Sequence, residues 1–323
     1  MQDKVKSEQG AITAVYVGID VCKERLDVYL HPVGKHFAVA NDAGGWRKLK
    51  RELTGRMIER VVMEATSKYH RSAHRSLAAA GLAVAVVNPR RARLFAEATG
   101  ALAKTDAIDA RLLALMGERL DPATVQPLRD IVETVQELAR ARKAAVAERV
   151  AIAHRHDVAS SAFLRRELAR RIDIVDRHVS RLDAELARII AADPVLARRY
   201  EILSSIPSIG TTIAVAIIAS FDEIGQLNAK QAAALAGLAP FAHDSGARLG
   251  NRVIRAGRPD LRQALYMAAL SAGRCNPDLK IFRQRLRDNA KPPKLAIIAV
   301  ARKLLVLANT LVADDRTWSP KAP

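Results

Sequence analysis

A change of sequence period within the first third of the chain constrains its fold more than any other feature. Between about residues 15 and 41, three β-rich runs follow one another with only short polar turns between them: VYVGID, RLDVYL and HFAVA. Segments of helical and of strand pattern then alternate in the order AGGWRKLKREL, RVVMEA, YHRSAHRSLAAAG and LAVAVVN. With one further helix from about residue 106, the predicted order is β-β-β-α-β-α-β-α. This order indicates an α/β domain that begins with a meander of antiparallel strands.

The middle of the chain has a helical character. From about residue 127 to 200 it is rich in Ala, Leu, Arg and Glu, with apolar residues at helical spacing and without glycine. This pattern predicts long helices or a helical hairpin, which typically serve as a spacer or a dimerisation element. The segment also carries a run of basic residues: Arg165, Arg166, Arg170 and Arg171. Such a run is either a solvated face or a track for a phosphate backbone, and the sequence leaves both interpretations open.

The last third of the chain is predicted to be mostly helical. In the segment SSIPSIGTTIAVAIIA, Pro207 and Gly210 lie where a helix-hairpin-helix turn would place them. Such a turn offers backbone N–H groups to a phosphate, but a plain connection between two core helices fits the segment equally well. We expect helices over about residues 232–238 and 259–272, with a polar, glycine-containing loop over 240–257 between them.

The charge balance of the chain points to a polyanionic partner. Lys and Arg number 52 against 34 Asp and Glu, which gives a formal net charge of +18. Nucleic acid is the leading candidate because Lys and Arg bind phosphates and release condensed counterions; an anionic membrane surface is the weaker alternative. The late apolar stretch over residues 295–313 carries Arg302 and Lys303 at its centre, where membrane insertion is costly. Because the N-terminal segment also lacks the pattern of a signal peptide, the sequence predicts a soluble cytoplasmic protein with no membrane partner.

Carboxylates stand at the ends of predicted elements. Asp20 ends the first strand, Glu64 ends the fourth, and Asp106 and Asp109 lie three apart at the start of a helix. In a sheet of this order the first and fourth strands are expected to be neighbours, with the helix laid across them. A cluster of this kind holds hard divalent cations such as Mg²⁺, which assist phosphodiester cleavage. We refer below to Asp20, Glu64, Asp106 and Asp109 as the four acids.

Each acid also has a structural interpretation. Asp20 is explained equally well as a turn residue before Lys23, and Asp106 as the N-cap of its helix. Glu64 is harder to explain in this way because it ends the apolar run VVM, where burial without a partner is costly. Taken together, and with the strand order in mind, the four acids favour a metal site.

Three motifs in the first half of the chain carry a family resemblance: VGIDVCKERLDVYL, VVMEATSKYHRSAHRSLAAAGLAVAVVNP and ALAKTDAIDARLLA. They resemble the RuvC-like DEDD domain of the IS110 family of insertion-sequence transposases, which is related to the pilin-gene-inverting recombinases. The resemblance implies a ribonuclease-H-like fold in which the four acids bind catalytic Mg²⁺. Lys104, in the motif KTDAIDA, is a candidate phosphate contact.

A second resemblance lies in the segment ALAGLAPFAHDSGARLGNRVIRAGRPDLRQALYMAALSA. It resembles the C-terminal transposase domain of the same family, which implies that Ser245 is the nucleophile. Without the resemblance, a serine between Asp and Gly is usually a turn residue, and the adjacent His243 and Asp244 rarely reach triad geometry. The candidate phosphate-binding residues around this serine are Arg248, Arg252, Arg255, Arg258 and Arg262.

The resemblance implies a domain organisation, a function and partners. The domains are a RuvC-like catalytic domain over 12–125, a helical or coiled-coil segment over 126–200 and a C-terminal transposase domain over 201–315. The implied function is that of a DNA transposase or recombinase with a covalent serine–DNA intermediate. Its partners would be donor and target DNA, a structured guide (bridge) RNA and further copies of the chain, as a dimer or tetramer. The alternatives are a structure-selective endonuclease of the junction-resolvase type, and a non-catalytic nucleic-acid-binding scaffold.

Overall fold

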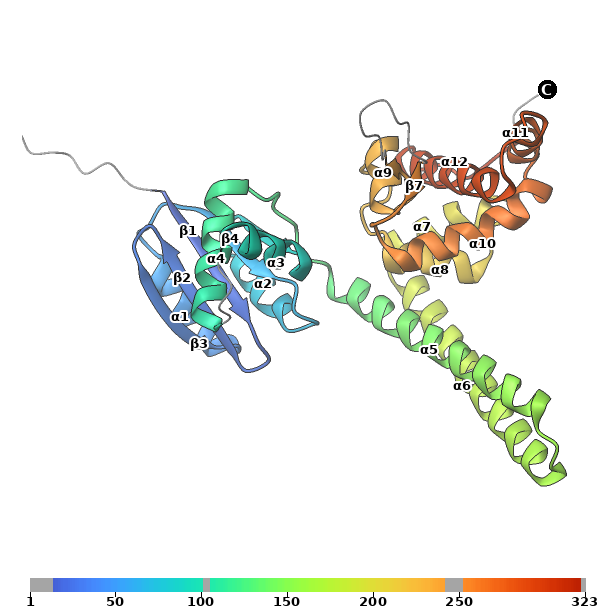
Figure 1. The fold of residues 1–323 in the computed structure, drawn as a ribbon, viewed down its shortest axis with the longest axis horizontal. Coiled ribbons are helices and arrows are strands. Elements are labelled where there is room, and N and C mark those ends of the chain that lie inside the picture. The colour runs from blue at the N-terminus through green and yellow to red at the C-terminus, as the bar shows by residue number, and fades with distance from the viewer. Residues whose placement is uncertain (1–13, 101–104, 242–251, 321–323) are drawn as a thin grey trace, which may run out of the picture. The chain divides into compact units, whose positions relative to one another are not determined.

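The computed structural model describes residues 14–100, 105–241 and 252–320, which fall into two compact units, residues 1–127 and 128–323. Figure 1 shows both units, and each is described by itself. Unit 1 combines a sheet with helices, as predicted. Its elements are β1 (Val15–Val21), β2 (Arg25–His31), β3 (Lys35–Ala40), α1 (Ala43–Leu53), β4 (Ile58–Glu64), α2 (His70–Ala78), β5 (Val84–Val87), α3 (Pro89–Ala98) and α4 (Asp106–Leu120).

The sheet of unit 1 has five strands in the order β3-β2-β1-β4-β5. The first three strands form the predicted antiparallel meander, whereas β4 joins β1, and β5 joins β4, in parallel. The prediction that the first and fourth strands are neighbours is therefore confirmed. Because β1 and β4 are parallel, their carboxyl ends meet at the same edge of the sheet.

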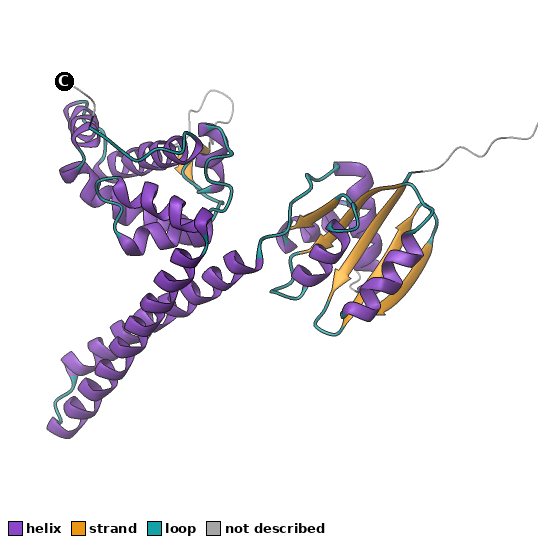
Figure 2. Ribbon diagram, turned by 180° about the vertical axis from the view of Figure 1, so that it is seen from behind, coloured by secondary structure: helices purple, strands orange, loops and turns teal. Residues whose placement is uncertain are grey.

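Helices cover both faces of this sheet (Figure 2). Leu49 of α1 and Leu77 of α2 pack in one apolar cluster with alternate residues of the strands. On the opposite face, α4 packs against β1, β2 and β4, and its Leu113 contacts the cluster around Val62. Gly18 permits this contact, because a Cβ there would overlap the backbone of α4 at Ala110. The helix that carries two of the four acids thus lies directly on the strand that carries Asp20.

We expect Gly18→Ala to destabilise unit 1 by about 1 to 3 kcal/mol, because the added methyl group forces α4 away from β1. Urea unfolding monitored by circular dichroism measures this loss. A matched control is Gly210→Ala, since a Cβ at Gly210 meets nothing within 4 Å. Equal stability of Gly18→Ala and the wild type would contradict the close packing of α4 on β1.

One helix of unit 1 was not predicted. The sequence pattern indicates a single helix after β5, but the structure has both α3 and α4 there. Asn88 caps α3 by accepting a hydrogen bond from the Arg90 amide at 2.9 Å, and Pro89 occupies the first turn. No residue of α3 is fully buried. The apolar periodicity that identifies a helix is therefore weak, and the Asn-Pro start signal was the better indicator.

Unit 2 is almost entirely helical, as predicted. The pair α5 and α6 forms the predicted helical hairpin, whose apolar contacts include Ile152 and Leu168. Arg170 and Arg171 of the basic run form ion pairs with Glu167 and Glu148, which favours the interpretation of a solvated face. The elements are α5 (Asp130–Val158), α6 (Ala162–Ala192), α7 (Pro194–Ser205), α8 (Thr211–Ser220), α9 (Ala229–Leu235), β6 (Pro240–Phe241), β7 (Val253–Ile254), α10 (Pro259–Cys275), α11 (Pro277–Asp288) and α12 (Pro293–Ala313).

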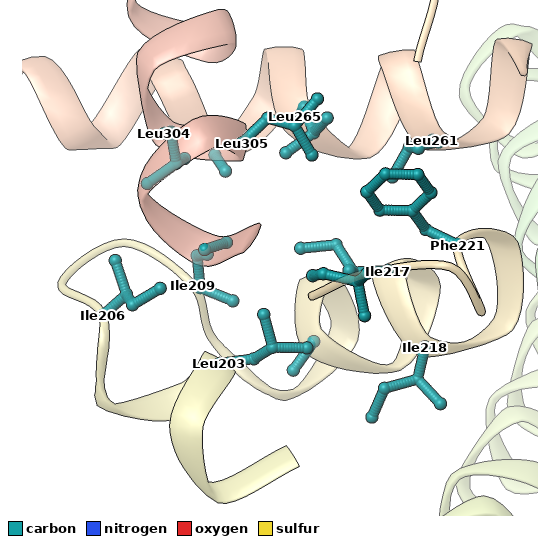
Figure 3. Close-up of a cluster of buried hydrophobic side chains, with 14 of the residues drawn as sticks. Leu203, Ile206, Ile209, Ile217, Ile218, Phe221, Leu261, Leu265, Leu304 and Leu305 are labelled. Carbon is teal, nitrogen blue, oxygen red and sulfur yellow. The ribbon is translucent and has the colours of Figure 1, made fainter. Parts of the chain in front are cut away.

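The main core of unit 2 gathers apolar side chains from α7, α8, α10 and α12 (Figure 3). Ile206 and Ile209, in the turn between α7 and α8, are both buried in it. The turn around Pro207 and Gly210 therefore connects two core helices. Among the described residues, α12 is the one helix long and apolar enough to cross a membrane, but it packs against α7, α9, α10 and α11 as part of this core.

Candidate active site

Asp20 and Glu64 lie side by side at the carboxyl edge of the sheet. In the register of β1 and β4, Gly18 pairs with Val62 and Ile19 pairs with Met63. The next residue on each strand is Asp20 and Glu64, both partly buried. Side chains alternate along a strand, so both acids point to the face that α4 covers at Gly18.

The other two acids open α4. Thr105 is the N-cap of the helix, and its Oγ1 accepts a hydrogen bond from the Ile108 amide at 3.3 Å. The interpretation of Asp106 as the N-cap is therefore wrong, because Asp106 is the first residue of the helix proper. Asp106 is exposed, and Asp109 follows one turn later.

Electrostatic coupling shows that the four acids converge. The pKa of Asp20 is raised from 3.8 to about 6. Burial of the carboxyl is the largest cause, followed by the negative charges of Asp109, Glu64 and Asp106. Two strands and one helix thus bring the acids close enough to repel one another. The interpretation of Asp20 as a turn residue is also wrong, because Asp20 lies within β1.

A fifth acid and an arginine belong to the same cluster and were missed from the sequence. Asp27 of β2 is the cross-strand partner of Asp20, and it is buried. Arg25 donates through Nε to Asp27 at 2.8 Å and through Nη2 to Asp106 at 2.6 Å. The guanidinium therefore bridges the sheet to the first residue of α4. The run RLDVYL could have indicated this pair, because alternate residues of a strand share one face and Arg25 and Asp27 are two positions apart.

The residue types suit a hard divalent cation, since all the acids offer carboxylate oxygens. Their mutual repulsion at Asp20 is the observation that fits a cation, because bound positive charge would relieve it. Within the described part of the chain, however, no three metal-binding side chains are arranged to hold one ion. The Asp106 carboxylate is instead engaged by Arg25. Arg25 contacts Oδ2 of Asp106, and a carboxylate has two oxygens, so coordination of a cation through Oδ1 is compatible with this ion pair.

The raised pKa of Asp20 makes stability depend on pH. The folded protein holds this proton more tightly than the unfolded chain, so the stabilisation is complete below pH 3.8 and is lost as the pH rises through about 6. In metal-free buffer we expect Asp20→Asn to match the wild type near pH 4 and to exceed its unfolding free energy by roughly 1 to 3 kcal/mol at pH 7. Urea unfolding across this range measures the difference. A difference that does not change with pH would contradict the repulsion at Asp20.

The second half of the expected site is only partly described. Lys104, Ser245 and Arg248 lie outside the described residues. Arg252 and Arg255 lie on or beside the short strand β7, and the guanidinium of Arg255 stands 5.4 Å from the centre of the Phe241 ring.

Two further arginines of this group, Arg258 and Arg262, form hydrogen bonds within unit 2. Arg258 pairs with Glu223, at 2.6 and 2.5 Å, and donates to the Ser220 carbonyl at 2.8 Å. Arg262 donates to the Ala256 carbonyl at 2.6 Å. Both side chains therefore hold the start of α10 to its neighbours, a role that the sequence pattern did not indicate.

Comparison with known proteins places both halves in one family. Residues 17–159 match a model described as a transposase, the DEDD transposase domain of IS110 elements. Residues 200–284 match a second model, described as a transposase of the IS116/IS110/IS902 family. The chain belongs to the IS110 family of transposases. This IS110 transposase is therefore an enzyme of DNA recombination, and the matched regions contain the four acids and Ser245.

Known relatives of the IS110 transposase agree with this assignment. It is 27% identical to the pilin gene-inverting protein of Moraxella bovis, over 96% of this chain and 99% of the relative. The corresponding protein of Moraxella lacunata has the same identity and coverage. It is also 30% identical to an uncharacterised 42 kDa protein of insertion element IS900 from Mycobacterium paratuberculosis, over 45% of this chain and 38% of that protein.

Proposed function

We propose that the IS110 transposase cuts and rejoins DNA with Mg²⁺ held by the four acids and with Ser245 as the nucleophile. The observation that carries this proposal is the convergence of three acids on Asp20, which raises its pKa to about 6. With a pKa of about 6, Asp20 is mostly ionised near pH 7, and its charge beside the other three acids favours a divalent cation over a lone proton.

The fold supports this function. A meander of three strands, with the fourth and fifth strands parallel to the first and a helix across them, is the arrangement expected of a RuvC-like, ribonuclease-H-like domain. We assign that catalytic domain to residues 12–125. The helical segment over 126–200 separates it in sequence from a C-terminal transposase domain over 201–315.

The residues divide the chemistry between them. Bound Mg²⁺ would supply positive charge to the attacking and leaving oxygens of the phosphodiester. Asp20 and Glu64 would bind the cation from the sheet, whereas Asp106 and Asp109 would bind it from helix α4. Arg25 fixes the start of α4 relative to β2 through its two ion pairs. The arginines that follow Ser245 in the sequence remain the candidates to bind phosphates: Arg248, Arg252, Arg255, Arg258 and Arg262.

Ser245 distinguishes a recombinase from a nuclease. When its hydroxyl oxygen attacks phosphorus, one phosphodiester is exchanged for another, so the energy of the broken bond is kept for rejoining. A junction-resolvase type of endonuclease would use the same four acids with water as the nucleophile. The likeness over full length to a protein named for inverting a pilin gene favours the recombinase, since inversion requires rejoining.

The proposed partners are donor and target DNA, a guide RNA and further copies of the chain. A net charge of +18 suits nucleic-acid backbones, and an aromatic content of 4% suits backbone recognition better than stacking on splayed bases. Association into a dimer or tetramer would allow the acids and Ser245 of one active centre to come from different subunits.

Metal binding tests the proposal without relying on activity. We expect Mg²⁺ at about 100 times its dissociation constant to stabilise the wild type by about 2.7 kcal/mol at neutral pH, through preferential binding to the folded state. Asp20→Asn should lose this response. Asp260→Asn, which removes an exposed carboxylate paired with Lys143 in unit 2, should keep it. If Mg²⁺ stabilises Asp20→Asn as much as the wild type, the metal site lies elsewhere.

A further inference from the structure

A basic pocket in unit 2 is lined by residues between 273 and 287, which lie far from the four acids in the sequence. It has a volume of about 430 Å³ and is lined by residues from the end of α10 and from α11. Its lining residues are Gly273, Arg274, Lys280, Arg283, Gln284 and Arg287. Four of these six are cations, and none of the six is an acid.

The cations share one side of α11. Lys280, Arg283 and Arg287 follow the i, i+3, i+7 spacing that places side chains in a row along a helix. Arg274 adds a further cation from the last turn of α10. The pocket therefore carries a row of positive side chains that extends over about two turns of α11. Such a row is suited to successive phosphates of a polynucleotide.

Packing positions one of these cations. The stem of Arg283 lies directly against Gly273, which is buried, and a Cβ at that position would overlap it. Arg283 is partly buried as a result. A guanidinium held in this way binds with less loss of side-chain entropy than one on a mobile stem.

These cations differ from several arginines of the hairpin in their partners. Arg149 pairs with Asp176, and Arg188 pairs with Glu185. Among the described residues, none of the four pocket cations forms an ion pair. The nearby Asp288 instead accepts a hydrogen bond from Gln284 at 2.8 Å. The positive charge of the pocket is thus left available to an external anion.

We propose that this pocket binds the phosphate backbone of duplex DNA and so helps to hold the substrate on the protein. The proposal rests on the action of the recombinase on DNA, but not on the four acids or on Ser245. A regular row of cations along a helix fits the evenly spaced phosphates of a duplex strand. Such contacts add affinity without sequence preference.

The test compares two double variants of the full-length protein that remove the same charge. Lys280→Gln/Arg287→Gln alters the pocket, whereas Arg170→Gln/Arg188→Gln alters paired arginines of α6. Binding to a fluorescein-labelled random duplex of about 30 base pairs is measured by anisotropy over a range of salt concentrations, in EDTA. Metal is absent, so the result does not depend on cleavage. Thermal unfolding of both variants confirms that each is folded.

We expect the pocket variant to bind the duplex more weakly and to reduce the slope of log K against log salt by about 2, one for each lost phosphate contact. The hairpin variant should retain the wild-type slope. Equal losses in both variants would show that only the overall charge matters and would overturn the proposal. So would an unchanged slope in the pocket variant. A parallel titration with transfer RNA shows which nucleic acid supplies the phosphates. If the pocket variant lost RNA binding but kept DNA binding, the assignment to DNA would be overturned.

Discussion

Asp20→Asn should reduce Mg²⁺-dependent DNA cleavage by at least about a thousandfold, because loss of a metal ligand removes several kcal/mol of charge stabilisation in the transition state. The same substitution is expected to stabilise the metal-free protein at pH 7, since it removes a repelled carboxylate. Loss of activity together with a gain in stability excludes unfolding as its cause. Cleavage of a labelled DNA carrying the ends of the element, with co-expressed flanking RNA present, measures the effect.

The matched control for this substitution is Asp260→Asn. Asp260 is an exposed acid of unit 2 that pairs with Lys143 at 2.6 Å, so its loss should leave cleavage within about twofold of the wild type, as for most exposed pairs. Full cleavage by Asp20→Asn would exclude both the recombinase and the nuclease that depend on the four acids. A non-catalytic scaffold predicts a different result, namely that the wild type itself shows no Mg²⁺-dependent cleavage.

Ser245→Ala has the second large expected effect. Removing the nucleophile of a covalent mechanism typically costs a factor of about 10³ or more, so both cleavage and rejoining should disappear. A suitable control is Ser271→Ala, because the Ser271 hydroxyl only donates to the Ala268 carbonyl within α10. Ser245→Ala keeps the four acids, and Mg²⁺ should therefore stabilise it as it stabilises the wild type.

The outcome for Ser245→Ala also separates the two catalytic interpretations. If water is the nucleophile, as in a junction resolvase, the variant keeps cleavage at the wild-type rate. If the serine is the nucleophile, strand cleavage is lost while duplex binding in EDTA remains. Retained cleavage would thus leave the four acids in place and would remove the covalent mechanism.

The sequence was a good guide where strong periodicity and backbone geometry decide the structure. The runs around Asp20 and Glu64 are apolar enough to be buried strands, and their order in the chain implied that β1 and β4 are neighbours. The long glycine-free segment likewise predicted the hairpin of α5 and α6. In both cases the spacing of the apolar residues fits only one type of element: a buried strand in the first case and a long amphipathic helix in the second.

The sequence was a poor guide to the partners of charged side chains. Nothing in the local pattern shows that Arg25 reaches Asp106, because the two are 81 positions apart and meet only when α4 crosses the sheet. Arg258 was predicted to contact phosphate, yet in the structure it pairs with Glu223 of another segment. Ion pairs of this kind depend on tertiary packing, and residue type alone does not reveal them.

The central claim is that the four acids and Ser245 serve one reaction, and detection of a covalent protein–DNA adduct tests it most directly. The wild type is incubated with Mg²⁺, co-expressed flanking RNA and end-labelled DNA, then resolved on a denaturing protein gel. We predict a labelled band at the mass of the protein joined to DNA that is absent from Ser245→Ala, from Asp20→Asn and from the wild type in EDTA. An adduct of unchanged intensity in Ser245→Ala or in Asp20→Asn would contradict the claim.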